Sequence, residues 1–440
     1  MSSRPGTAAR RRTAFDAVDP PEEKKYLDCV HCGLCLPTCP TYLEMGNEMD
    51  SPRGRIYLIR MADEGRISIT DSFVKHMEAC LLCRACETAC PSGVQFGSLM
   101  EKTRGQVERK YKRPLAQKLL RRFIFSVFPY PDRMRAMLKL GRFSQRFGLH
   151  RLAVRGALSQ SLKIMEDLLP PPDKVPAEIP LHRVTPAAGT AKFRVGLLTG
   201  CVQRVLYPQV NAATVRVLAK NGCVVVIPQE QGCCGSLQAH EGGLEPAKAF
   251  ARKTIDAFEQ AKVDYVITNA AGCGTMMKGY PDLLRSDPQY ADKSEVFGTQ
   301  VRDALQFLHE IGTNGRFGPL PITVTYHDAC HLVHGQRIRN EPRALLRSIP
   351  SLDLAELREA DFCCGSAGTY NLLEPEYGLR FLERKVDNIV ATGAEIVATA
   401  NPGCALQIAM GLRKRNSQIQ VLHPIELLDM AYRGAIPSRS

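Results

Sequence analysis

The sequence predicts a multidomain α/β protein, with a helical N-terminal module followed by a duplicated α/β domain. Three observations support this prediction. Two cysteine runs of identical spacing lie near the N-terminus, at 29–39 and 80–90. Two stretches of the C-terminal half repeat each other at an offset of about 130 residues. Within each stretch, apolar β-rich segments alternate with helical patterns, which is typical of a mainly parallel sheet covered by helices.

Each N-terminal run has the spacing Cys-x2-Cys-x2-Cys-x3-Cys-Pro, which wraps a [4Fe-4S] cluster in bacterial-type ferredoxins. Every cysteine of the second run lies 51 positions after its counterpart in the first. In two-cluster modules the fourth thiol of each run ligates the other cluster. The predicted ligands are therefore Cys29, Cys32, Cys35 and Cys90 for cluster 1, and Cys80, Cys83, Cys86 and Cys39 for cluster 2. A pair of zinc sites is the alternative, but four closely spaced thiols per run favour clusters.

The segment between the two runs predicts a helix near the clusters. Arg55–Ala62 has the apolar spacing of a helix whose buried face packs beside the cysteines. The preceding turn, Asp50–Arg55, contains two arginines. These either lie near the clusters or belong to a solvated helix start, and the sequence leaves both alternatives open.

Composition and charge narrow the class of protein. Seventeen cysteines in 440 residues exceed what a cytosolic protein carries without metal or redox chemistry. No apolar segment follows Arg10–Arg12 and no apolar run reaches the length of a membrane span, so neither a secretion signal nor a spanning helix is expected. The expected compartment is the reducing cytoplasm, with a peripheral position on the cytoplasmic face of the inner membrane as a further hypothesis.

The formal charge of +13 is concentrated in one segment. Arg104–Lys163 contains sixteen Lys or Arg against two acidic residues, a net charge of +14. Such a block indicates an anionic partner. Its apolar residues recur at helical spacing, which favours helices packed on the next domain, with an interfacial membrane helix as the alternative. No nucleic-acid-binding motif accompanies the charge, so nucleic acid is not an expected partner.

These features predict six segments. They are a disordered tail at 1–20, a two-cluster ferredoxin module at 21–108, a basic helical segment at 109–167, a Pro-rich linker at 168–191, and cysteine-rich repeats at 192–315 and 316–440. In the repeats, strands are expected at 195–198, 224–227 and 263–268, and helices at 246–260 and 379–391.

Each repeat supplies four further thiols near the expected carboxyl ends of its strands, where parallel sheets place their sites. They are Cys201, Cys233, Cys234 and Cys273 in repeat 1, and Cys330, Cys363, Cys364 and Cys404 in repeat 2. The glycine after each Cys-Cys pair allows the close backbone approach that a metal centre needs. Three interpretations stay open: an iron–sulfur cluster, a zinc ion held by four thiolates, or a redox-active dithiol. Metal is favoured, with iron–sulfur ahead of zinc.

Other candidate residues receive more modest interpretations. His327, His331 and His334 flank Cys330 and could ligate metal or carry protons, but ordinary hydrogen-bonded histidines are favoured. Cys223 has no counterpart in repeat 2 and is expected to be a small buried apolar residue. No residue is assigned a catalytic role. Because no dinucleotide fingerprint, Walker loop or nucleophile elbow is present, any flavin is expected on another chain.

Several stretches together resemble one family, the iron–sulfur subunit of bacterial glycolate oxidase. They are Cys29-Val-His-Cys-Gly, Cys39-Pro-Thr-Tyr, Asp50-Ser-Pro-Arg-Gly-Arg-Ile-Tyr-Leu-Ile, Cys90-Pro-Ser-Gly-Val and Cys363-Cys-Gly-Ser-Ala-Gly-Thr-Tyr. The cysteine runs and Cys-Cys-Gly repeats are shared with iron–sulfur subunits of glycerol-3-phosphate dehydrogenase, lactate-utilisation proteins and heterodisulfide reductase.

The resemblance implies a complex with FAD-binding subunits that oxidise glycolate to glyoxylate. This chain would carry electrons from the flavin towards a quinone or another membrane acceptor. A related glycerol-3-phosphate or lactate dehydrogenase complex, or a catalytic subunit similar to heterodisulfide reductase, is the alternative. The last is disfavoured because Gly274-Thr-Met and Ala405-Leu-Gln follow the final cysteines, with no second thiol at Cys-x2-Cys spacing.

Overall fold

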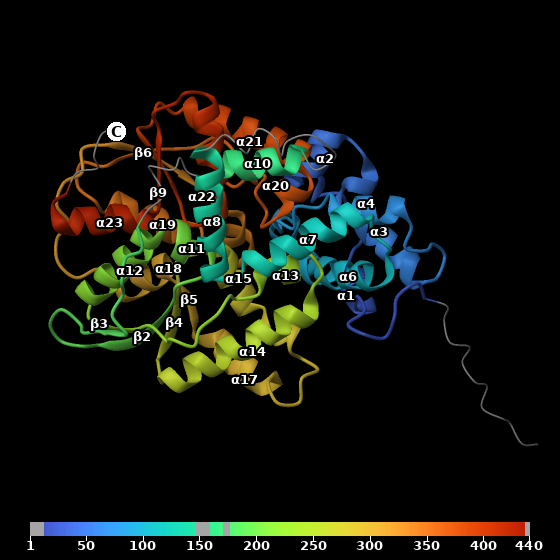
Figure 1. The fold of residues 1–440 in the computed structure, drawn as a ribbon, viewed down its shortest axis with the longest axis horizontal. Coiled ribbons are helices and arrows are strands. Elements are labelled where there is room, and N and C mark those ends of the chain that lie inside the picture. The colour runs from blue at the N-terminus through green and yellow to red at the C-terminus, as the bar shows by residue number, and fades with distance from the viewer. Residues whose placement is uncertain (1–12, 147–158, 170–176, 436–440) are drawn as a thin grey trace, which may run out of the picture. The chain divides into compact units, whose positions relative to one another are not determined.

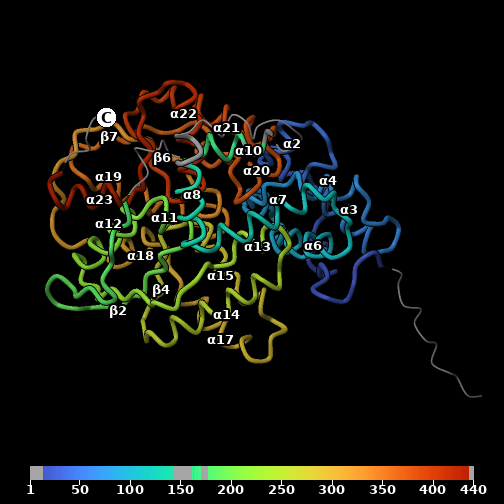
Figure 2. The backbone as a smooth tube through the Cα atoms, in the orientation of Figure 1, coloured from blue at the N-terminus to red at the C-terminus, as the bar shows by residue number. Residues whose placement is uncertain are grey.

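The computed structural model describes residues 13–146, 159–169 and 177–435 (Figure 1). The chain divides into two compact units. Unit 1 comprises residues Met1–Lys112 together with the short segment His240–Leu244, and unit 2 comprises the remainder. Figure 2 traces the backbone from the blue N-terminal module to repeat 2 in orange and red.

Unit 1 is built from short helices around the two cysteine runs. They are α1 (Glu23–Leu27), α2 (Pro40–Met45), α3 (Pro52–Asp63), α4 (Asp71–Glu78), α5 (Ala85–Thr88) and α6 (Phe96–Lys110), with 3-10 turns at Leu36–Thr38 and Glu48–Asp50. The helix predicted at Arg55–Ala62 is confirmed as part of α3. Ser51 caps α3 by accepting a hydrogen bond from the Gly54 amide. The core of the unit includes Ile59, Phe73 and Leu99.

The predicted disordered tail at 1–20 is only partly within the described residues. Residues 1–12 lie outside them, but residues 13–20 contact unit 1. Phe15 is buried in the core cluster, and the Ala14 amide donates to the Ala62 carbonyl at 2.9 Å. For residues 13–20 the prediction is wrong, because Phe15 packs in the core and Asp16 pairs with Arg109 of α6 at 2.9 Å.

Repeat 1 forms a five-stranded sheet in unit 2. Its strands are β1 (Val184–Thr185), β2 (Phe193–Leu198), β3 (Cys223–Val226), β4 (Tyr265–Thr268) and β5 (Val301–Asp303). Their order is β1-β3-β2-β4-β5, and all pairs except β1–β3 are parallel. Helices lie between the strands: α11 (Val202–Leu206), α12 (Pro208–Lys220), α13 (Ser236–His240), α14 (Leu244–Ala261), α15 (Ala271–Lys278), α16 (Tyr280–Leu283), α17 (Ala291–Gln300) and α18 (Ala304–Ile311).

Repeat 2 forms a second, all-parallel sheet in the same unit. Its strands are β6 (Thr323–His327), β7 (Asp353–Ala355), β8 (Ile396–Thr399) and β9 (Gln420–Leu422), in the order β7-β6-β8-β9. The intervening elements are η3 (His331–Gly335), a π-helical turn, and the helices α19 (Asn340–Arg347), α20 (Tyr370–Leu373), α21 (Pro375–Val390), α22 (Pro402–Lys414) and α23 (Pro424–Arg433). The predicted alternating α/β architecture is confirmed.

From Arg113 onward the basic segment belongs to unit 2. It contains α7 (Leu115–Val127), α8 (Pro131–Arg146) and α10 (Ser159–Leu168), with Pro131 beginning α8. Met134 and Leu138 of α8 pack on Val205 and Leu206 of α11. The favoured interpretation, packing on the next domain, is therefore confirmed.

Two further details concern segment boundaries and a lone thiol. The strand β1 lies within the stretch expected to be a Pro-rich linker and pairs with β3, so the sheet begins earlier than the predicted repeat. Residues 170–176 of that stretch lie outside the described residues. Cys223 is completely buried in β3, as predicted.

Candidate functional site

The thiols of unit 1 line two hollows. Cys29, Cys32, Cys35 and Cys90 line one of about 420 Å³ that is partly open to solvent. Cys39, Cys80, Cys83 and Cys86 line another of about 300 Å³. The structure thus brings the fourth thiol of each run to the three leading thiols of the other. The donors are the sulfurs that iron–sulfur clusters require, so the residues present fit such a group in each hollow.

The backbone between the cysteines repeats the same unusual conformation in both runs. His31 and Gly33 adopt positive φ values of 56° and 86°, and their counterparts Leu82 and Arg84 adopt 54° and 62°. These left-handed residues curl each loop so that successive thiols face one point. In the second run the Leu82 amide donates to the Cys80 sulfur at 3.3 Å. The side chain of Arg84 also forms an ion pair with Glu101 at 3.0 Å.

Burial changes the acidity of these thiols. Burial, with smaller contributions from the neighbouring thiols Cys29 and Cys39, raises the pKa of Cys35 to about 11. Burial likewise raises the pKa of Cys86 well above its usual range, with Cys83, Cys80 and Cys39 adding to the effect. Thiols in this setting stay protonated until a cation replaces the proton, which is the behaviour of metal ligands.

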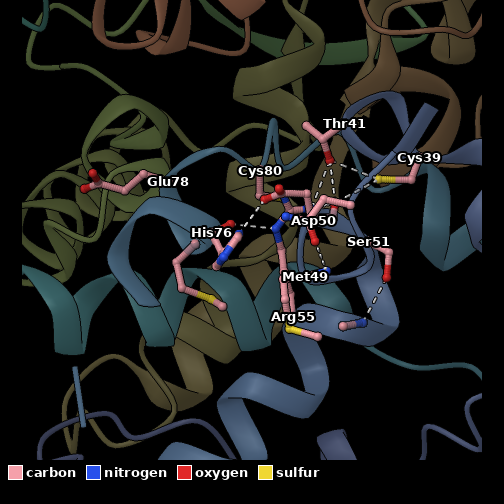
Figure 3. A network of polar contacts seen from close by, with 12 residues as sticks. Cys39, Thr41, Met49, Asp50, Ser51, Arg55, His76, Glu78 and Cys80 are labelled. Carbon is pink, nitrogen blue, oxygen red and sulfur yellow. Dashed lines mark hydrogen bonds and ion pairs between the residues drawn. The ribbon is translucent and has the colours of Figure 1, made fainter. Parts of the chain in front are cut away.

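A buried ionic network surrounds Cys39 and Cys80 (Figure 3). The completely buried Arg55 donates from Nε to the His76 carbonyl at 2.7 Å and from Nη1 to Thr41 Oγ1 at 3.0 Å. Its Nη2 lies 3.4 Å from Asp50 Oδ1, and His76 Nδ1 lies 2.9 Å from the same oxygen. Thr41 Oγ1 in turn lies 3.2 Å from Cys39 Sγ. Of the two open alternatives for the arginines, Arg55 therefore lies near the cysteines.

Arg53 is placed differently from Arg55. It is partly exposed, pairs with Glu48 at 2.7 Å and lines the hollow of Cys29. Both arginines of the Asp50–Arg55 turn therefore line a cysteine hollow, one buried and one at the rim.

A second buried arginine, Arg104 of α6, holds the main chain of the second run. Its Nη2 donates to the carbonyls of Met77 at 3.0 Å and Cys80 at 2.5 Å. Its Nη1 donates to the carbonyl of His240, in the segment His240–Leu244 of the same unit. Carbonyls at the carboxyl end of α4 suit a cation, because the helix dipole is negative there. Arg104 was not among the predicted site residues, although it shares a helix face with the buried Leu99, Met100 and Val107.

The four thiols of repeat 1 converge at the carboxyl end of its sheet. Cys201 follows β2, and its sulfur lies 3.6 Å from that of Cys233. Hydrogen bonds from Cys233 and Cys273 lower the pKa of Cys234 well below its usual range. Gly235 has a φ of 84°, and a Cβ there would meet the Ala247 backbone at 3.1 Å, so only glycine fits after the thiol pair.

Repeat 2 reproduces this arrangement with additional polar groups. The neighbouring thiols of Cys363 and Cys404, and the nearby imidazole of His327, lower the pKa of Cys364 well below its usual range. Cys330 supplies the fourth thiol, and it raises the pKa of Cys363 through a hydrogen bond. The expectation of ordinary hydrogen-bonded histidines is wrong for His327, since neither ring nitrogen forms a hydrogen bond with any described residue.

Lys385 is a further polar residue of this region that was not among the predicted site residues. Its side chain is completely buried in α21, and Nζ donates to the main-chain carbonyls of Glu359 and Ala360. Burial lowers its pKa to about 8, while the nearby thiols of Cys364 and Cys363 oppose that change. The signal was present in the sequence, because Lys385 lies on the same helical face as Phe381 and Ile389.

The two cysteine-rich sites adjoin each other within unit 2. The Ala271 amide donates to the Ala400 carbonyl at 3.0 Å, and the Gly272 amide donates to Asn401 Oδ1 at 3.2 Å. Cys273 and Cys404 follow these two segments directly. The ends of β4 and β8 are thus joined, and each carries one thiol of its site.

Three family models match separate parts of the chain. A 4Fe-4S dicluster domain matches residues 25–94, and a cysteine-rich domain matches 195–278 and again 324–409. The linker region of the glycolate oxidase iron–sulfur subunit matches residues 116–169. The chain is 38% identical to the probable glycolate oxidase iron–sulfur subunit of Bacillus subtilis, over 92% of this chain and 94% of that protein.

The chain belongs to the glycolate oxidase iron–sulfur subunit family. It is also 35% identical to the glycolate oxidase iron–sulfur subunit of Escherichia coli, over 92% of this chain and 93% of that protein. Lactate utilization protein A of Exiguobacterium is 32% identical over 55% of this chain and 99% of its own length. The predicted resemblance and the predicted order of ferredoxin module and duplicated cysteine-rich domain are confirmed. The match to a 4Fe-4S dicluster domain indicates that the chain binds iron–sulfur clusters.

Proposed function

We propose that this chain is the electron-transfer subunit of a flavin-dependent glycolate oxidase complex. It would receive electrons from FAD-binding partner subunits and pass them towards a quinone-type acceptor. The observation that carries the proposal is the pair of adjoining hollows in unit 1, which share Cys86 as a lining residue. Such sites in series suit electron transfer, and the chain has no flavin-binding motif of its own.

The proposed ligands are those that each hollow brings together. Cys29, Cys32, Cys35 and Cys90 would hold one [4Fe-4S] cluster, and Cys39, Cys80, Cys83 and Cys86 the other. When bound, each cluster supplies a one-electron carrier. Arg55 and Arg104 place positive charge and hydrogen-bond donors beside the second set, which stabilises thiolates and sets the main-chain geometry. The thiols of repeats 1 and 2 would hold further metal centres, for which iron–sulfur is favoured over zinc.

The overall reaction balances without a further reactant. Glycolate loses two electrons and two protons to the partner's flavin and becomes glyoxylate. The two electrons would cross this chain one at a time, while the protons leave from the flavin side. A quinone then takes up two electrons and two protons to become the quinol.

Peripheral membrane contact would bring the chain to such an acceptor. Among the residues that the structure describes, no helix combines the length and apolar character needed to cross a bilayer. Helix α7 leaves Leu115, Leu119 and Phe123 exposed by 71%, 56% and 41%, spaced four residues apart on one face. Lys118 and Arg122 lie beside them, so the face combines apolar and basic groups as interfacial helices do.

The decisive experiment uses the anaerobic complex co-expressed with its flavin partners. Glycolate, D-lactate and glycerol-3-phosphate are added in turn, and the bleaching of the broad visible iron–sulfur absorbance is followed. Rapid bleaching by glycolate supports the proposal. Bleaching by another donor alone would move the chain to a related dehydrogenase complex, and no bleaching with intact clusters would reject the electron-transfer role.

A further inference from the structure

Repeat 2 contains a buried histidine where repeat 1 has an apolar residue. His327 is the last residue of β6, three positions before Cys330, and its side chain is completely buried. The equivalent position in repeat 1, three residues before Cys201, is Leu198 at the end of β2. The duplicated sheets therefore place different side chains at the same point of their cysteine sites.

The imidazole of His327 has unused donor and acceptor capacity. Neither ring nitrogen forms a hydrogen bond with any residue of the described part of the chain. Leaving a buried polar group unsatisfied costs about 1–3 kcal/mol, so such a group in a native fold points to a ligand or a function. An imidazole nitrogen and the sulfurs of Cys364 and Cys404 all lie within 4.8 Å of one another. These separations suit donors that converge on one metal centre.

The charged groups near His327 are engaged elsewhere. The carboxylate of the adjacent Asp328 is held by Arg343 through two contacts of 2.8 Å. Lys385 donates to the carbonyls of Glu359 and Ala360. The imidazole is thus left facing the thiols of its own site.

We propose that His327 ligates the metal centre of repeat 2 through an imidazole nitrogen, alongside Cys364 and Cys404, whereas the centre of repeat 1 has thiolate ligands only. The proposal rests on the proposed function, in which both repeats hold metal centres. Repeat 2 keeps all four thiols that repeat 1 has, so the imidazole takes the place of one of them as a ligand. Replacing thiolate by neutral imidazole removes negative charge from a centre and raises its reduction potential. The centre of repeat 2 therefore has a higher potential than a thiolate-only centre in the same place, and Lys385 adds positive charge to the same side.

The test uses the full-length chain, purified anaerobically with 15N-labelled histidine. Pulsed electron paramagnetic resonance of the reduced and oxidised protein measures whether a histidine nitrogen couples to an iron–sulfur signal. The variants are His327→Cys, which keeps a ligand of the thiolate type, and His327→Leu, which installs the residue of repeat 1. His334→Asn is the matched control, because it changes another buried histidine that flanks Cys330.

We expect a histidine coupling in the wild type and in His334→Asn, and none in His327→Cys. The His327→Cys chain should keep its iron and sulfide content while the potential of one centre falls. The proposal is overturned if the wild type shows no such coupling, or if the coupling persists in His327→Cys and His327→Leu. A separate outcome concerns the proposed function itself. If Cys364→Ser leaves iron and sulfide unchanged, repeat 2 holds no iron–sulfur centre.

Discussion

Arg55 is buried against Asp50, with Nη1 donating to the Asp50 carbonyl and Nη2 lying 3.4 Å from the Asp50 carboxylate. The pair lies between Cys39 and Cys80, so it joins the two cysteine runs across the sequence. We expect Arg55→Leu to destabilise unit 1 by about 3–5 kcal/mol, because among the described residues it leaves the buried Asp50 carboxylate with His76 alone as its partner. The unfolding temperature and the iron content of the anaerobically purified protein check this prediction, and both should fall.

The matched control for this variant is Arg60→Ala, in the same helix. Arg60 pairs with Glu64 on the exposed side of α3, and exposed ion pairs of this kind contribute little. Iron content and unfolding temperature should stay at wild-type values. If both substitutions lowered the unfolding temperature and the iron content equally, the effect of Arg55→Leu could not be attributed to the burial of Arg55.

Cluster binding by the assigned thiols predicts a selective loss of iron. Cys83→Ser should remove about half of the iron bound by unit 1, since it breaks only one of two ligand sets. Cys223→Ala changes another buried cysteine, one that lines neither hollow, and it should leave the iron content unchanged. Iron and labile sulfide are measured on protein purified without oxygen. Retention of all the iron in Cys83→Ser would contradict the ligand assignment.

Gly242 predicts a steric effect within unit 1. Its φ is 86°, and a Cβ there would lie 2.3 Å from the Arg104 carbonyl oxygen. Gly242→Ala should cost about 1–2 kcal/mol for the left-handed backbone and about 1–3 kcal/mol more for the overlap. Gly393→Ala shares the left-handed conformation, with a φ of 66°, but has open space around it. The unfolding temperature should therefore fall further for Gly242→Ala, and equal values would refute the predicted overlap.

Glu426 predicts a pH dependence of stability. Burial raises the pKa of its carboxyl from about 4.5 to about 7, although Oε2 accepts a hydrogen bond from the His423 amide. The folded state therefore holds a proton that the unfolded state releases, and stability is lost as the pH rises from 4.5 to 7. Glu426→Gln should remove roughly 3 kcal/mol of this loss. The free energy of unfolding of the full chain, measured between pH 5.5 and 8, checks this prediction. The variant should become more stable relative to the wild type only as the pH rises.

The exposed face of α7 predicts binding to anionic membranes. Leu119→Glu should weaken sedimentation with vesicles of phosphatidylglycerol by about tenfold, because it removes an apolar contact and adds a repelled charge. Val296→Glu, at a position in α17 exposed by 62%, is the control and should bind like the wild type. Binding that is the same for both variants would remove α7 as the contact surface.

Spacing along the chain was enough to predict the ferredoxin module from the two cysteine runs. It was also enough to predict the duplication and the alternation of strands and helices. Each of these depends on residues that are neighbours in sequence or on a local period, so no long-range contact is needed to recognise them. The same holds for α3 and for the packing of the basic helices, whose apolar residues recur at helical intervals.

Tertiary structure decided which polar residues matter around the sites. Arg55, Arg104, His327 and Lys385 owe their burial to segments far from them in sequence, and a side chain's hydrogen-bond partners are set only when those segments meet. Sequence alone therefore determined the cysteine sets and the α/β architecture. The fold determined that the imidazole of His327, at the position where repeat 1 has Leu198, is buried without a hydrogen-bond partner among the described residues.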